Sequence, residues 1–108
     1  MTPFHLEIRK SVFIAAGLSV IGVSAAMGAD ADKGEQLARR WCATCHLVEA
    51  GQKQASADVP PFSAIARRPD FVPEKIALFL LNPHPKMPNF PLSPAEATDI
   101  AAYIASLR

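Results

Sequence analysis

Cys42-Ala43-Thr44-Cys45-His46 is the stretch that decides the fold of this chain of 108 residues. Cys-x-x-Cys-His is the attachment signature for c-type haem: each thiol forms a thioether with a haem vinyl group, and the histidine that follows ligates the iron. Two residues between the cysteines place their sulfurs about one helical turn apart. We therefore expect Cys42, Cys45 and His46 to hold one covalently attached haem c, with His46 as an iron ligand.

Three other uses of a Cys-x-x-Cys pair compete with this interpretation. A thioredoxin-like redox pair follows a strand, whereas Lys33–Trp41 has the pattern of a helix. A structural zinc site needs four ligands, and outside the motif the only further histidines are His5, in the N-terminal leader, and His84. A purely structural role is disfavoured because both cysteines of the chain lie in the motif, behind a predicted export signal.

The N-terminal part of the chain has the layout of a secretory signal peptide. Arg9-Lys10 precedes Ser11–Ala29, an uncharged run that is apolar at first and ends in small residues. We predict cleavage after Ala29, with Ala26 and Gly28 as the alternative ends. An uncleaved membrane anchor is the competing interpretation, since about 20 apolar residues can span a bilayer.

This interpretation divides the chain into a signal peptide, residues 1–29, and one domain, residues 30–108. We expect the domain to be periplasmic, and to make no stable membrane insertion once the leader is removed. The apolar core of so small a domain is usually not enough for stability, and a further stabilising element is needed. A covalently held haem would be such an element. Basic and acidic residues balance once Glu7 and Arg9-Lys10 are removed, which argues against nucleic acid as a partner.

Four segments of the predicted domain have helical patterns, and none has the pattern of a strand. The segment between Glu49 and Val59 has no periodicity and is expected to be a loop. The expected helices are one capped by Asp32 and running to Trp41, one over Phe62–Arg67, one from Pro73 to Asn82-Pro83, and a last one that begins with the capping box Ser93, Pro94 and Glu96.

A proline-rich loop, Pro83–Pro91, contains the candidate for the second axial ligand. Fast one-electron transfer favours a sixth ligand that stays bound in both oxidation states, and a thioether does this while raising the reduction potential. Met87 is the only methionine outside the predicted leader, and Pro85 and Pro88 immobilise the chain around it. We rank it above His84 as the ligand, and we favour this role over that of a gap-filling core side chain.

The predicted domain contains several short motifs in sequence order. They are Gly34 eight residues before Cys42, the Cys-x-x-Cys-His motif itself, Pro60-Pro61-Phe62, Lys86-Met87-Pro88 and the closing Asp99–Ile104. In this combination the domain resembles a class I c-type cytochrome of the short bacterial kind. The resemblance implies an all-α fold of three to four helices around one covalently bound haem. It also implies that the N- and C-terminal helices cross closely, with Gly34 at the crossing and Tyr103 packing there.

The resemblance further implies a partner for the second ring nitrogen of His46. In the family, a proline carbonyl accepts a hydrogen bond from this nitrogen, which fixes the ring and raises its basicity as a ligand. Pro60 is the better match for that proline, and Pro61 is the other candidate.

The expected function is one-electron transfer between redox protein partners, without an enzymatic activity. With His46 and Met87 bound, the iron has no open position for ligand binding or oxygen chemistry. One alternative is the haem c electron-transfer subunit of a periplasmic dehydrogenase complex. Another, if Met87 does not bind, is a gas-binding or peroxidase-like haem protein.

Overall fold

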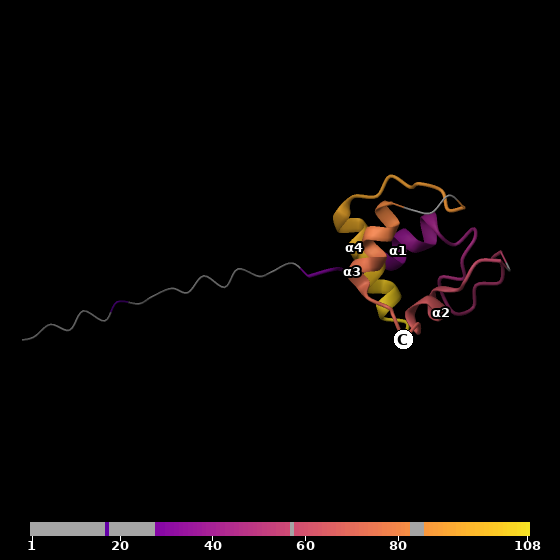
Figure 1. Ribbon diagram of the computed structural model, residues 1–108, viewed down its shortest axis with the longest axis horizontal. Helices are drawn as coiled ribbons and strands as arrows, with labels where there is room; N and C mark the ends of the chain where they lie inside the picture. The colour runs from indigo at the N-terminus through magenta and orange to yellow at the C-terminus, as the bar shows by residue number, and fades with distance from the viewer. Residues whose placement is uncertain (1–16, 18–27, 57, 83–85) are drawn as a thin grey trace, which may run out of the picture.

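Four helices and no strand make up the described part of the computed structural model, which comprises residues 17, 28–56, 58–82 and 86–108. They are α1 (Ala31–Trp41), α2 (Phe62–Ala66), α3 (Pro73–Leu81) and α4 (Pro94–Ala105) (Figure 1). The all-α class expected from the sequence is confirmed. No helix in these residues is both long and apolar enough to cross a membrane.

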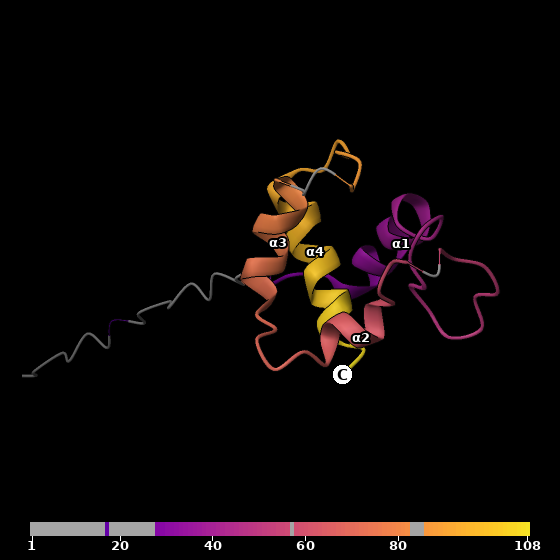
Figure 2. The ribbon, with the colours of Figure 1, turned by 45° about the vertical axis from the view of Figure 1, so that its right-hand side comes forward.

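Helix α4 is the element against which the other three helices pack. Among the described helices, the pairs in contact are α4 with α1, with α3 and with α2. Figure 2 shows α3 and α1 on opposite sides of α4, and α2 near its C-terminal end. The buried side chains of α4 therefore form the middle of the core; they are Ala97, Asp99, Ile100, Ala101, Tyr103 and Ile104.

The crossing of α1 and α4 depends on the missing side chain of Gly34. A Cβ atom built on this glycine would lie 2.0 Å from the backbone oxygen of Asp99 and 2.9 Å from the backbone nitrogen of Ile100. Both distances are far inside van der Waals contact, so the two helix backbones touch directly at this point. The close crossing expected from the resemblance is confirmed, with Gly34 at its centre.

The N-terminus of α1 is capped by Asp30, and the expectation that Asp32 caps it is wrong. Asp30 has an extended backbone, and its carboxylate accepts a hydrogen bond from the Lys33 N–H at 3.0 Å. Asp32 lies inside the first helical turn, where a negative charge interacts favourably with the positive end of the helix dipole. The backbone of Asp30 is held from outside the helix, because its N–H donates to the carboxylate of Asp99 at 2.8 Å.

The other helix boundaries follow the sequence closely. At the start of α4, Ser93 Oγ accepts from the Glu96 N–H at 3.1 Å and the Glu96 carboxylate accepts from the Ser93 N–H at 2.8 Å, so the capping box is confirmed. The Ser93 N–H holds the pKa of Glu96 below its ordinary value. Helix α3 begins at Pro73, as expected, whereas α2 stops at Ala66 and leaves Arg67 as its C-cap.

Tyr103 links α4 to the segment that follows the Cys-x-x-Cys-His motif. Its hydroxyl donates to the buried carbonyl of Val48 at 2.6 Å, and burial raises the pKa of Tyr103. Its ring packs against Phe62, with ring centroids 6.4 Å apart. The core thus extends from the α1–α4 crossing to the motif.

Candidate haem site

The motif begins where α1 ends and continues as a tight turn. The Cys42 N–H donates to the Ala38 carbonyl at 2.8 Å. The Cys42 carbonyl in turn accepts from the N–H of Cys45 at 3.2 Å and from the N–H of His46 at 2.9 Å. These three- and four-residue spacings are helix-like, and they bring Cys45 and His46 round to the side of the turn that carries Cys42.

The two thiols of the motif differ in exposure. Cys42 is 5% exposed and packs in the core, whereas Cys45 is exposed, and neither forms a disulfide. Burial raises the pKa of Cys42 to about 11, so this thiol is protonated at neutral pH. Neither sulfur is engaged in a disulfide, and a free thiol is the group that adds to a haem vinyl group.

The imidazole of His46 is oriented by a backbone carbonyl. His46 Nδ1 lies 2.6 Å from the carbonyl oxygen of Pro60. A carbonyl only accepts hydrogen bonds, so Nδ1 carries the proton and the lone pair of Nε2 is left for a metal. The carbonyl of Pro61 instead accepts the N–H groups of Ala64 and Ile65 as α2 begins.

Met87 lies on a loop that packs against α1. Its side chain is half-buried and contacts the core. The same loop places Phe90 against Trp41, the last residue of α1, with ring centroids 5.5 Å apart. The loop is thereby attached to the helix that leads into Cys42. His84, the competing ligand, lies outside the described residues.

Gln52 is a residue of the site that sequence reasoning missed. Its side-chain Nε2 donates to the carbonyls of Ala43 and His46, each at 2.8 Å. The surrounding segment is the expected loop, and its lack of periodicity draws no attention to a single polar side chain. The nearest available signal is Gly51, whose φ of 86° turns the chain just before Gln52.

The donor set fits a covalently attached haem. Two free thiols lie on one turn with an imidazole whose Nδ1 is already engaged, and a thioether and aromatic side chains lie on the elements around them. Cys42 and Cys45 would hold the group through its vinyl carbons, and His46 Nε2 would reach the iron. Within the described ranges no three His, Cys, Asp or Glu residues group to hold a metal ion.

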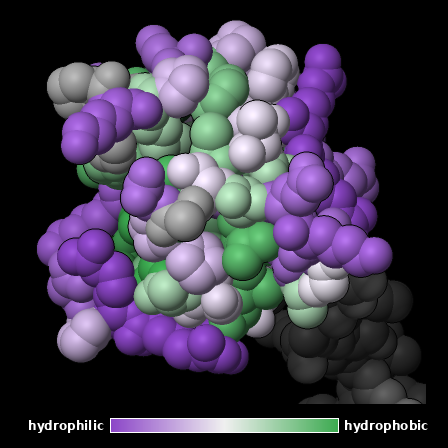
Figure 3. Space-filling model, turned by 90° about the vertical axis from the view of Figure 1, so that its right-hand side faces the viewer, coloured by the Kyte–Doolittle hydropathy of each residue, from purple (hydrophilic) through white to green (hydrophobic). Residues whose placement is uncertain are grey.

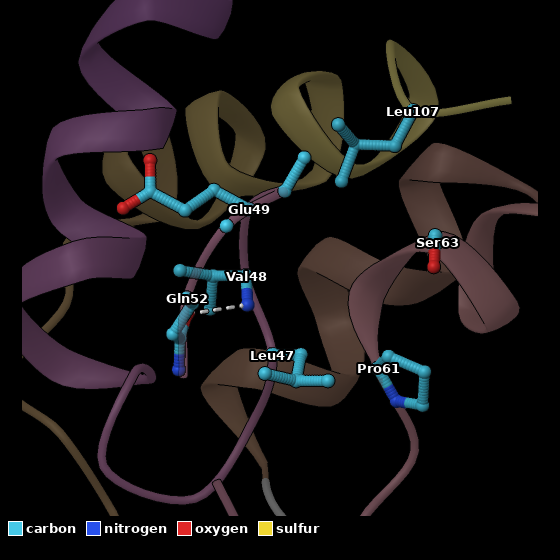
Figure 4. A pocket seen from close by; sticks show the side chains of 9 residues that line it. Leu47, Val48, Glu49, Gln52, Pro61, Ser63 and Leu107 are labelled. Atoms are coloured by element: carbon cyan, nitrogen blue, oxygen red, sulfur yellow. Dashed lines mark hydrogen bonds between the residues drawn. The ribbon is translucent and has the colours of Figure 1, made fainter. Parts of the chain in front are cut away.

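Two surface hollows are lined by residues other than the candidate haem ligands. The first, beside the motif, is lined by Leu47, Val48, Glu49, Gln52, Pro61, Ser63 and Leu107, among others (Figure 4). The second runs between α3 and α4 and is lined mostly by apolar side chains, among them Ala77, Leu78 and Ala102. Figure 3 shows apolar surface bordered by hydrophilic side chains on the face turned away from the N-terminal segment.

Two comparisons with known proteins gave a match. Residues 29–104 match a family model described as cytochrome c oxidase, cbb3-type, subunit III. The chain is also 60% identical, over 104 residues, to cytochrome c-552 of Bradyrhizobium diazoefficiens, an alignment that covers 96% of this chain and 98% of that relative. No solved structure matches the chain.

Proposed function

This chain belongs to the c-type cytochromes, and from that premise we propose that Nε2 of His46 and the sulfur of Met87 would be the two protein ligands of its haem iron. The chain carries covalently attached haem c and transfers electrons between redox protein partners. The observation that supports the assignment most strongly is the contact between His46 Nδ1 and the Pro60 carbonyl, which leaves Nε2 for the iron.

Each residue of the site has a separate task in this proposal. The haem supplies an iron that changes its oxidation state by one electron. Cys42 and Cys45 fix the group to the chain through thioethers, and the Pro60 carbonyl orients His46 and raises its basicity. Met87 would supply a thioether sulfur as the second iron ligand, and with both ligands bound no position would be left open for a substrate. We therefore propose an electron carrier without enzymatic activity.

Carbon monoxide tests this assignment on the wild-type protein. If His46 and Met87 both bind the iron, carbon monoxide finds no open position, and the visible spectrum of the reduced protein should stay unchanged under carbon monoxide at neutral pH. The protein should also oxidise and reduce reversibly by one electron in a potentiometric titration. Prompt binding of carbon monoxide by the wild type would contradict the proposal and favour the gas-binding or peroxidase-like alternative.

A second candidate function is that of an electron-transfer subunit in a larger enzyme, such as a periplasmic dehydrogenase. The matching family model favours it, because its description is that of an oxidase subunit. The relative favours the free carrier, since it is named as a cytochrome and not as a subunit of an enzyme. Purification from the native periplasm under mild conditions separates the two, because a subunit would co-elute with a larger chain in fixed proportion.

We also propose that the leader is removed after Ala29 and that the domain is periplasmic. The Asp30 nitrogen lies 2.8 Å from the Asp99 carboxylate, and Asp99 is only 8% exposed. Cleavage after Ala29 would turn this nitrogen into a charged α-amino group. The hydrogen bond from this nitrogen to the Asp99 carboxylate, which is charged only at its acceptor while the nitrogen is an amide, would then join two opposite charges and become stronger.

N-terminal sequencing of the exported protein should therefore begin at Asp30. In that protein, Asp99→Asn should lower the free energy of unfolding by about 1–2 kcal/mol, because hydrogen bonds to charged groups contribute roughly 1.5–3 kcal/mol and the variant keeps a neutral acceptor. The control is a chain that starts at Gly28, in which the same substitution should cost less because the Asp30 nitrogen is a neutral amide. A membrane-bound product that retains Met1 would show that the leader is an anchor.

A further inference from the structure

The side-chain amide of Gln52 is bonded on both ends to the backbone around the motif. Its Oε1 accepts from the Val48 N–H at 2.9 Å. Its Nε2 lies 2.8 Å from the carbonyls of Ala43 and His46 and 2.9 Å from that of Gln54. The N–H partner requires the oxygen and the carbonyl partners require the nitrogen, so these neighbours determine the orientation of the amide.

Gln52 completes a row of bonds along the backbone that carries His46. The Cys45 carbonyl accepts from the Ser56 N–H at 3.0 Å, and the Leu47 carbonyl accepts from the Phe62 N–H at 2.9 Å. Between them, the His46 carbonyl accepts from Gln52. Three successive carbonyls are thus held, and the middle one, on the residue that would ligate iron, depends on a side chain.

The ring of His46 is held at the same time by its other contacts. Its Nδ1 bonds to the Pro60 carbonyl at 2.6 Å, and its ring packs on Phe62, with centroids 5.3 Å apart. The hydrogen bond from Nδ1 stays short only while the backbone of His46 and the backbone of Pro60 keep their positions relative to each other. Gln52 restrains the backbone of His46 directly, because it bonds to the His46 carbonyl.

We propose that Gln52 is a positioning residue for the iron ligand His46, and that it thereby contributes to the reduction potential; this inference rests on the proposed ligation by His46. By holding the His46 main chain, Gln52 keeps Nδ1 against the Pro60 carbonyl. That bond makes the imidazole a stronger donor, and a stronger donor favours the oxidised iron, which lowers the potential. Removing the Gln52 amide loosens the bond and raises the potential.

The variants Gln52→Ala and Gln52→Met test this role in the haem-loaded protein. Neither changes the net charge, and methionine keeps nearly the length of the side chain while losing its hydrogen bonds. Both variants should shift the reduction potential upward. A tenfold change in how much more tightly the site binds one oxidation state of the iron than the other corresponds to about 59 mV. Both should also move the hyperfine-shifted ring-proton signals of His46 in the oxidised protein.

Two control variants separate positioning from general stability. Gln54→Ala changes an exposed neighbour that contributes only its backbone carbonyl, so it should leave the potential and the His46 signals unchanged. Asp30→Ala removes the side-chain cap at the far end of α1, and it should lower stability without moving the potential.

The outcomes distinguish this inference from the ligand assignment itself. A loss of stability in both Gln52 variants, with the potential and the His46 signals as in the wild type, would overturn the inference and leave Gln52 a loop-stabilising residue. Failure of the ligation proposal would be visible in the wild type, which would then lack hyperfine-shifted signals from a His46 ring bound to the iron.

Discussion

Replacing Met87 with alanine is expected to lower the reduction potential on the order of 0.1 V or more, since axial ligands set haem potentials over roughly 0.8 V and a thioether raises the potential. The oxidised variant should lose the weak far-red absorption that arises from sulfur bound to iron. The reduced variant should bind carbon monoxide, because the substitution opens an axial position. A potentiometric titration and visible spectra with and without carbon monoxide measure all three changes.

Two further variants make this result specific to the sulfur ligand. Met87→His exchanges the thioether for an imidazole that can still fill the axial position, so it should lower the potential but keep carbon monoxide out. His84→Ala removes the competing ligand and should leave the potential, the far-red band and the closed axial position unchanged. The assignment is wrong if these changes follow His84→Ala and are absent in Met87→Ala.

Replacing Gly34 with alanine is expected to destabilise the fold strongly. At an exposed helical site, this exchange would stabilise by up to about 1 kcal/mol through helix propensity. Here the new Cβ would lie 2.0 Å from the Asp99 backbone oxygen, and two helix backbones cannot yield as a flexible side chain can. The helices would have to separate, and we expect the free energy of unfolding to fall by about 3 kcal/mol, at or above the upper end for overpacked sites.

Urea unfolding of the haem-loaded protein measures this loss, since the thioethers keep the haem attached in the unfolded state. Gln36→Ala is the matched control, because Gln36 is an exposed residue of the same helix and the change should be nearly neutral. Equal stability of Gly34→Ala and the wild type would show that the two helices can separate at little cost.

The helix boundaries that depend on local bonds could be predicted from the sequence. The capping box joins Ser93 to a residue three positions away, and Pro73 suits a first turn whatever surrounds it. Asp30 and Asp32 show the limit of such reasoning. Both can cap a helix, and the choice between them depends on the contact of Asp30 with Asp99, which is 69 positions away in the chain.

The haem site could be predicted from the sequence to a similar extent. The Cys-x-x-Cys-His motif needs only its own spacing, and its residues are brought together by one turn. The roles of Gly34 and Pro60 came from a resemblance, because no local pattern states which backbone atoms will approach them. Gln52 had no such precedent: a glutamine in an irregular loop can bond to any nearby backbone group, and only the folded chain selects its partners.

The proposed ligation by Met87 can be tested on the unmodified protein by labelling the methyl groups of its methionines with carbon-13. After removal of the leader, Met87 is the only methionine, so the spectrum of the reduced protein should contain one labelled methyl signal. If the sulfur binds the iron, this methyl group lies over the haem ring, and its proton signal should be shifted far upfield of the ordinary methionine range. A single signal at the ordinary position would contradict the account, because it would show that the Met87 sulfur is not bound to the iron.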